Sequence, residues 1–241
     1  MELVDSHIHL PAYRDPDPVL RLASMSGTVL VSCTVNAAEF GANLTLKREN
    51  PKTVRCFLGV HPSDVREEPP SQSLGGLVAG ADGVGEIGLD AKYSDASPGS
   101  LQMKAFLDQL GLAERFSKPV QVHSRGSEKA CLDALSSFRL ARVLMHWFEG
   151  EEHVQRVVSS GYYVSVGPAI LYSKRVRRVA AVIPAERLLT ESDGPVGYKA
   201  IGGGSGPALI PSVVFRLAEV RGVGFDEMAR TVKGNADRFL S

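Results

Sequence analysis

The stretch Val4-Asp5-Ser6-His7-Ile8-His9-Leu10 places two histidines one residue apart near the start of the chain. On a β-strand, residues i and i+2 point to the same face, so His7 and His9 would direct both imidazoles at one point. This geometry suits a shared metal ion. The apolar residues around the pair predict that the stretch forms a buried strand.

Seven further strand-like runs follow this one. The eight runs begin at Leu3, Thr28, Thr53, Gly83, Pro119, Arg142, Tyr162 and Arg187, and the starts lie 20 to 36 residues apart. Most are continuous runs of Val, Ile and Leu type, as strands buried on both faces of a parallel sheet require. A βα unit of this size, repeated eight times, predicts an α/β fold of the (β/α)8 TIM barrel type.

Segments that can carry helices separate the runs. We expect helices at 18–25, 38–49, 100–116, 127–138, 151–160 and 173–182, and two extra C-terminal helices at 208–221 and 225–240. No linker or low-complexity segment interrupts the pattern. We therefore expect a single domain over residues 1–241.

The composition limits the possible functions. With 27 basic and 27 acidic residues, the chain has no net charge, which argues against a broad basic surface that grips duplex nucleic acid. Cys33, Cys56 and Cys131 are widely spaced and odd in number, so a disulfide framework or a cysteine zinc site is not expected. We see no signal-peptide pattern and no apolar run of about 18 residues, so we expect a cytoplasmic protein without a membrane partner.

Residue types that bind metals recur where the later strand-like runs end. They are His61, Glu86, His123, His146 and Asp193. In a TIM barrel the carboxyl ends of the strands surround the active site, so these residues and the first histidine pair should meet at one pocket. A lone histidine at a strand end is usually structural, but five of the chain's six histidines belong either to this series or to the first pair.

Four histidines and two carboxylates exceed what one catalytic zinc needs. We expect two divalent ions (Mg²⁺, Mn²⁺ or Zn²⁺) with Glu86 as the bridge. We assign His7, His9, Glu86 and Asp193 to one ion, and Glu86, His123 and His146 to the other. Such a pair can ionise a water and stabilise both oxygens of a phosphoryl centre, while Asp193 orients or deprotonates the water. Asp193 and Glu86 are therefore the expected catalytic residues.

Other residues are expected to bind the substrate or to support the metal ligands. His61 is expected to bind either a substrate phosphate or metal. Arg125, two residues after His123, is well placed for the pocket. Glu191 shares a strand face with Asp193, so it either orients a ligating histidine or is a group of the barrel interior.

Basic residues cluster after the seventh run, at Lys174, Arg175, Arg177 and Arg178. They form either a phosphate site or a solvated helix face. Lys92 and Tyr93 are weaker pocket candidates. The GxGxxG match at 83–88 lies within a strand and not at a strand-to-helix turn, so no nucleotide cofactor is expected.

The ordered motifs resemble those of the TatD family of metal-dependent hydrolases, which are amidohydrolase-like barrels. They are DSHIHL at Asp5, GVHP at Gly59, GEIGLD at Gly85, VHSRG at Val122, HWFEG at His146, YYVSVG at Tyr162, TESDGP at Thr190 and GNADRFL at Gly234. The resemblance implies a two-metal barrel that hydrolyses DNA phosphodiesters, often from the 3′ end of single strands. It implies the same six ligands, with His61 and Glu191 in the site.

The chain departs from the family pattern at two places. The family's usual HCFSG motif is replaced by a sequence with Trp147 and Glu149. Trp147 can stack a base, whereas Glu149 adds negative charge near a phosphate path. The loop at 199–201, followed by glycines, offers fewer phosphate contacts than the basic loop usual in the family.

Three hypotheses follow. The first is a metal-dependent deoxyribonuclease whose partner is DNA, acting at single-stranded ends as a 3′ exonuclease. The second is a hydrolase of small ester, amide or aminoacyl-ester substrates on the same two-metal site. The third is a catalytically silent binding barrel, against which the complete ligand set argues.

Overall fold

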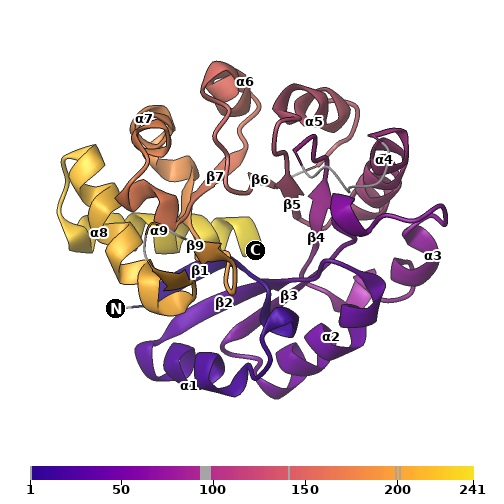
Figure 1. The fold of residues 1–241 in the computed structure, drawn as a ribbon, viewed down its shortest axis with the longest axis horizontal. Coiled ribbons are helices and arrows are strands. Elements are labelled where there is room, and N and C mark those ends of the chain that lie inside the picture. Colours follow the sequence, from indigo (N-terminus) through magenta and orange to yellow (C-terminus); the bar gives the residue numbers. More distant parts are fainter. Residues whose placement is uncertain (1, 93–98, 141, 199, 201) are drawn as a thin grey trace.

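Eight parallel strands form the centre of the molecule. The computed structural model describes residues 2–92, 99–140, 142–198, 200 and 202–241. The strands are β1 (Leu3–Ile8), β2 (Thr28–Cys33), β3 (Val54–Leu58), β4 (Gly83–Gly88), β5 (Val120–His123), β6 (Val143–Met145), β7 (Tyr163–Val166) and β8 (Leu188–Thr190). They pair in sequence order, and each lies inside a predicted run. The TIM barrel prediction is confirmed (Figure 1).

Hydrogen bonds between the segments around β8 and β1 bring the two ends of the sheet together. The Thr190 hydroxyl donates to the Val4 carbonyl at 2.9 Å. Beyond the strand ends, the Asp193 N–H donates to the carbonyl of His7 at 2.9 Å, and the His9 N–H donates to the carbonyl of Gly194 at 2.7 Å. Barrel closure therefore fixes the first histidine pair next to Asp193.

Helices cover the outside of the sheet (Figure 1). They are α1 (Asp17–Ser26), α2 (Phe40–Glu49), α3 (Ser71–Leu74), α4 (Gly99–Arg115), α5 (Glu128–Leu135), α6 (Val154–Ser159), α7 (Lys174–Val182), α8 (Ile210–Arg221) and α9 (Phe225–Leu240). All but α3 overlap predicted helices. Helix α3 was not predicted, because four residues with one buried side chain, Leu74, show no helical period. Among the described residues, no helix is long and apolar enough to cross a bilayer.

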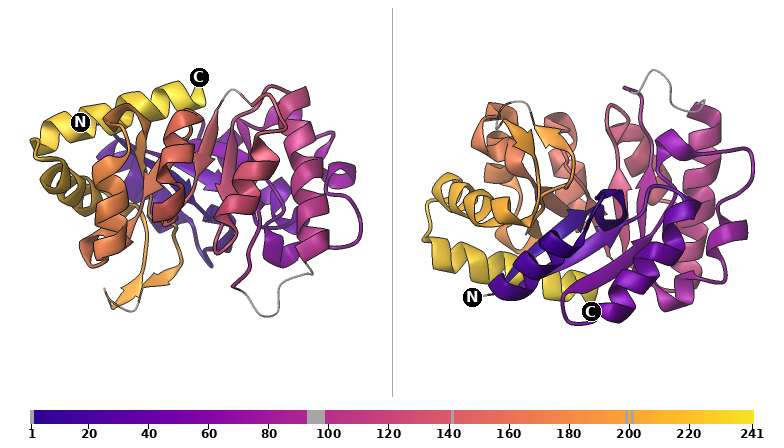
Figure 2. Two further views of the ribbon diagram at one scale, coloured as in Figure 1. Left: turned by 90° about the horizontal axis from the view of Figure 1, so that it is seen from above. Right: turned by 60° about the horizontal axis from the view of Figure 1, so that its bottom comes forward.

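Helix α9 covers one end of the barrel. Its Phe239 ring lies 6.0 Å from the ring of Phe57 and 5.5 Å from that of Tyr163, so strand side chains pack on it directly. Figure 2 shows α9 crossing the end opposite the small hairpin of β9 (Gly197–Tyr198) and β10 (Gly203–Gly204). With one end filled by apolar packing, the carboxyl end remains for polar residues.

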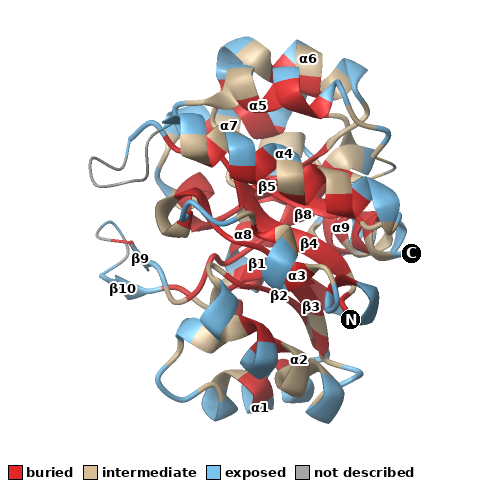
Figure 3. Cartoon of the chain, turned by 90° about the vertical axis from the view of Figure 1, so that its right-hand side faces the viewer, coloured by how far each residue is buried: buried red, intermediate tan, exposed pale blue. Residues whose placement is uncertain are grey.

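The strands are the most buried part of the fold (Figure 3). Every residue of β1 and β4 is buried, including Asp5, His7 and Glu86. Burial of ionisable groups is costly unless they are paired or coordinate metal. The barrel interior therefore contains polar groups whose partners need to be identified.

Candidate metal centre

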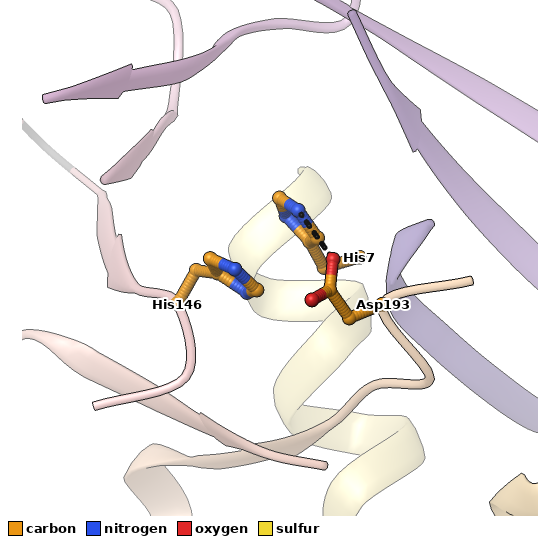
Figure 4. A group of neighbouring side chains, drawn as sticks. All are labelled: His7, His146 and Asp193. Atoms are coloured by element: carbon orange, nitrogen blue, oxygen red, sulfur yellow. Dashed lines mark ion pairs between the residues drawn. The ribbon is translucent and has the colours of Figure 1, made fainter. Parts of the chain in front are cut away.

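All six predicted ligands lie together at the carboxyl end of the barrel. His7, His146 and Asp193 form one group whose ligand atoms lie within 4.8 Å of one another, and Figure 4 shows these side chains facing a common space. His7, His9 and Glu86 form a second such group. His61, Glu86 and His123 form a third. Strands far apart in sequence thus deliver their end residues to one place.

One oxygen of Glu86 faces the first histidine pair. Glu86 Oε2 lies 3.4 Å from His7 Nε2 and 3.3 Å from His9 Nε2, and the two nitrogens are 3.1 Å apart. Asp193 Oδ1 lies 3.6 and 3.4 Å from the same nitrogens. Ligand atoms placed tetrahedrally about 2.1 Å from a zinc ion lie about 3.4 Å apart, so these spacings fit a shared ion.

The other oxygen of Glu86 faces different histidines. Glu86 Oε1 lies 2.8 Å from His123 Nδ1, 3.5 Å from His146 Nε2 and 3.7 Å from His61 Nε2. The His7 and His146 rings stack with their centroids 3.6 Å apart, so the two sets are adjacent. Each oxygen of Glu86 therefore faces a different set of histidines, and His61 joins the second set.

Hydrogen bonds at the outer ring nitrogens set the tautomers of four histidines. Two of these partners belong to the first histidine pair: His7 Nδ1 lies 2.6 Å from Gln121 Oε1, and His9 Nδ1 lies 3.2 Å from the Cys33 carbonyl oxygen. The other two are carboxylates: His146 Nδ1 lies 2.7 Å from Glu191 Oε2, and His123 Nε2 lies 2.6 Å from Asp90 Oδ2. Each outer partner is an acceptor, so a ring that gives up its inner proton to a metal ion keeps the outer proton and offers the inner lone pair. Four lone pairs converge on the two carboxylates, which is the donor set a divalent ion requires.

The supporting acceptors are themselves held in place. The amide nitrogen of Gln121 donates to the Ser6 carbonyl at 2.9 Å, which fixes the amide oxygen toward His7. Glu191 accepts from the Ser165 hydroxyl at 2.5 Å and from the Trp147 N–H at 3.1 Å, in addition to His146. Glu191 therefore orients a candidate ligand, one of the two roles its strand position suggested.

Two of the candidate ligands, His9 and His123, hold their protons strongly. Burial lowers the pKa of His9, but hydrogen bonds to Asp193 and Glu86 outweigh burial and raise that pKa to about 10. Burial also lowers the pKa of His123, but hydrogen bonds with Asp90 and Glu86 outweigh burial and raise that pKa to about 9. Bound metal requires these rings unprotonated, so it must displace protons.

His61 differs electrostatically from these ligands. Burial lowers its pKa to about 4, so the ring is neutral at ordinary pH. Its Nδ1 lies 2.7 Å from the Ser63 hydroxyl, which donates to Asp64 at 2.8 Å. A neutral ring suits either of the roles expected for His61.

A cavity of about 740 Å³ lies over the centre. Arg125 and Trp147 line it, whereas Glu191 is fully buried below it. The described basic residues after β7 do not line the cavity. Arg178 pairs with Glu151 and Arg175 with Glu152, so this cluster is a helix surface. Lys92 is exposed and also does not line the cavity, and Tyr93 lies outside the described residues.

Four residues of this site were not predicted from the sequence. Gln121 precedes His123 by two residues and Asp90 follows Glu86 by four, so alternation along the strands would have found both. Ser165 gives no such signal because serines are common in strands of any role. Tyr198, whose ring stacks on Trp147 at 5.1 Å, lies in a hairpin whose path the sequence does not specify.

A TIM barrel with clustered histidines and carboxylates at its carboxyl end defines a metal-dependent hydrolase. Residues 4–241 match the family described as TatD related DNase, and the chain belongs to that family. A human protein named deoxyribonuclease TATDN3 is 29% identical, over 97% of this chain and 93% of its own. The metal-dependent hydrolase YjjV of Escherichia coli is 31% identical, over 96% and 95%. The crystal structure of YjjV superposes with a TM-score of 0.86, covering 98% of this chain and 97% of that one.

Glu191→Gln tests how the centre is supported. Glu191 accepts from three donors, and a glutamine has only one acceptor atom, so it cannot accept from both sides. We expect metal affinity to fall about 10–100-fold by calorimetric titration. The exposed Glu186→Gln, made in the turn just before β8, is the control and should bind metal like wild type. Unchanged affinity in Glu191→Gln would contradict this role.

The raised histidine pKa values predict how metal stabilises the protein at different pH. In metal-free protein, protonated His9 and His123 stabilise the fold fully below about pH 6.5, and this contribution is lost as pH rises toward about 9–10. Metal competes with these protons, so its stabilising effect should grow with pH, by up to about 1.4 kcal/mol per pH unit for each proton displaced. Thermal melts in EDTA and in Mn²⁺, from pH 6 to 8.5, measure this. A metal-induced Tm gain independent of pH would contradict it.

Proposed function

We propose that this protein is a two-metal deoxyribonuclease that hydrolyses phosphodiester bonds at the ends of single DNA strands, with 3′ ends as the preferred site. The observation that carries the proposal is the shared carboxylate, since the two oxygens of Glu86 face two sets of histidine lone pairs. The deoxyribonuclease name of the human relative supports DNA as the substrate.

The proposed ligands are the six predicted residues. His7, His9, Glu86 and Asp193 would hold one divalent ion, and Glu86, His123 and His146 the other. Two such ions supply the charge that makes water acidic and stabilises the attacking and leaving oxygens of a phosphoryl centre. Glu86 keeps the two sets adjacent, and Glu191 holds His146 in the ligating tautomer.

Asp193 is the proposed proton acceptor. Burial raises its pKa, but the hydrogen bond from His9 and the charges of nearby histidines outweigh burial and lower it. The carboxylate is therefore ionised at neutral pH and lines the cavity. It can take a proton from the attacking water as one P–O bond forms and the ester P–O bond breaks.

Three residues are proposed to bind the substrate. Arg125 lines the cavity and can pair with a phosphate. His61 is neutral and faces the second histidine set, where it can contact metal or a phosphate oxygen. Trp147 provides an aromatic surface for a base.

A second candidate function has its own support. Asp64, Glu128 and Glu149 also line the cavity, and their carboxylates suit a neutral or cationic substrate better than a polyanion. A hydrolase of small ester, amide or aminoacyl-ester substrates would use the same centre. Turnover of such substrates, with none on DNA, would favour this candidate.

Asp193→Ala tests the proposed reaction. In Mg²⁺ or Mn²⁺ the wild-type protein should release nucleotides from end-labelled single-stranded DNA, and EDTA should stop release. Loss of the proton acceptor should lower the rate by about 10²–10⁴-fold. The exposed Asp226→Asn is the control and should retain wild-type rate. Release by Asp193→Ala at the wild-type rate would overturn the proposal.

A further inference from the structure

The wall of the cavity beside His146 is aromatic and apolar. Trp147, Pro195 and Val196 line it. The Trp147 ring stacks on the Tyr198 ring, with centroids 5.1 Å apart and planes inclined by 25°. Tyr198 is buried, so it backs the indole, while Trp147 itself is only half-buried. Part of the indole surface therefore faces the cavity, where a flat ligand group can lie on it.

The backbone holds the indole in this position. Trp147 has a φ of 40°, in the left-handed region that a bulky residue adopts rarely. Its N–H donates to Glu191, which also orients His146. Because Trp147 follows His146 directly, a base lying on the indole would place its phosphate next to the histidine cluster.

The charges around the cavity limit how many further phosphates it can bind. Among the lining residues that the structure describes, Arg125 is the one lysine or arginine. Asp64, Glu128 and Glu149 line it as well, in addition to the carboxylates of the centre. Affinity for a nucleic-acid strand comes mainly from lysine and arginine contacts to phosphates. Beyond the proposed metal ions, a long strand would meet three carboxylates here and one cationic side chain.

We infer that the cavity is a subsite for one unpaired base and its adjoining phosphate, so that the substrate is recognised as a nucleotide-sized phosphodiester and not along a strand. A cavity of about 740 Å³ is of the size that takes one small ligand. Trp147 binds the base, Arg125 one phosphate, and Glu149 disfavours additional phosphates. This inference rests on the proposed function.

The first test uses fluorescence, because Trp147 is the only tryptophan in the chain. Deoxyadenosine monophosphate, which has no diester bond to cleave, should quench Mg²⁺-loaded protein saturably. Deoxyribose 5-phosphate, which lacks the base, should not quench. Raising KCl from 50 to 200 mM should weaken nucleotide binding by no more than about threefold, the effect of one phosphate contact in a strand. Absence of saturable quenching would overturn the subsite.

The second test compares kcat/KM for a dinucleotide and a single-stranded 12-mer. The two kcat/KM values should agree within about threefold, and both should depend only weakly on salt concentration. Trp147→Leu should lower both about tenfold or more, and Trp147→Phe, which keeps a π-face, should restore most of the loss. Glu149→Gln should raise kcat/KM for the 12-mer more than for the dinucleotide, whereas the exposed Glu152→Gln should change neither.

The outcomes separate this inference from the proposed function. A 12-mer strongly preferred over the dinucleotide, with kcat/KM falling about 100-fold between the two salt concentrations, would mean about five phosphate contacts and would overturn the subsite alone. Equal activity of Trp147→Leu and wild type would also overturn it. Failure to cleave DNA of any length, in protein shown to bind metal, would overturn the proposed function and the inference together.

Discussion

The buried carboxylate of Glu86 is the interaction around which the rest of the site is arranged. Its side chain is 3% exposed and lies among five histidines, with His7 and His9 at one oxygen and His61, His123 and His146 at the other. A carboxylate at this depth is costly unless charges or metal compensate it. The outer hydrogen bonds of the histidines matter for this reason, because they aim each inner nitrogen at Glu86 or Asp193.

The barrel makes this arrangement rigid. Parallel strands bring their carboxyl ends to one face, and the bonds between the ends of β1 and β8 set Asp193 against the first histidine pair. Phe239 of α9 fills the opposite end. Apolar packing at one end and along the helices therefore stabilises a fold whose other end is occupied by charged groups. Such charged clusters within a stable scaffold are typical of functional sites.

Much of the fold and of the candidate site could be predicted from the sequence, because both depend on two periodicities in it. The repeating βα units predicted the barrel, and the alternation of side chains along a strand placed His7 and His9 on one face. Alternation also applies to Gln121 and Asp90, which the prediction overlooked. The tautomers and the Trp147–Tyr198 stack could not be predicted, since they depend on contacts between strand ends and loops distant in sequence. The short helix α3 escaped because its single buried side chain gives no period.

We propose that Glu86 is shared by two metal sites, and anomalous diffraction from Mn²⁺-loaded crystals tests this sharing directly. We expect two anomalous peaks about 3.5–4 Å apart. One should lie among His7, His9 and Glu86 Oε2, and the other beside Glu86 Oε1 and His123. A single peak at full Mn²⁺ occupancy, or two peaks of which only one contacts Glu86, would contradict a shared carboxylate.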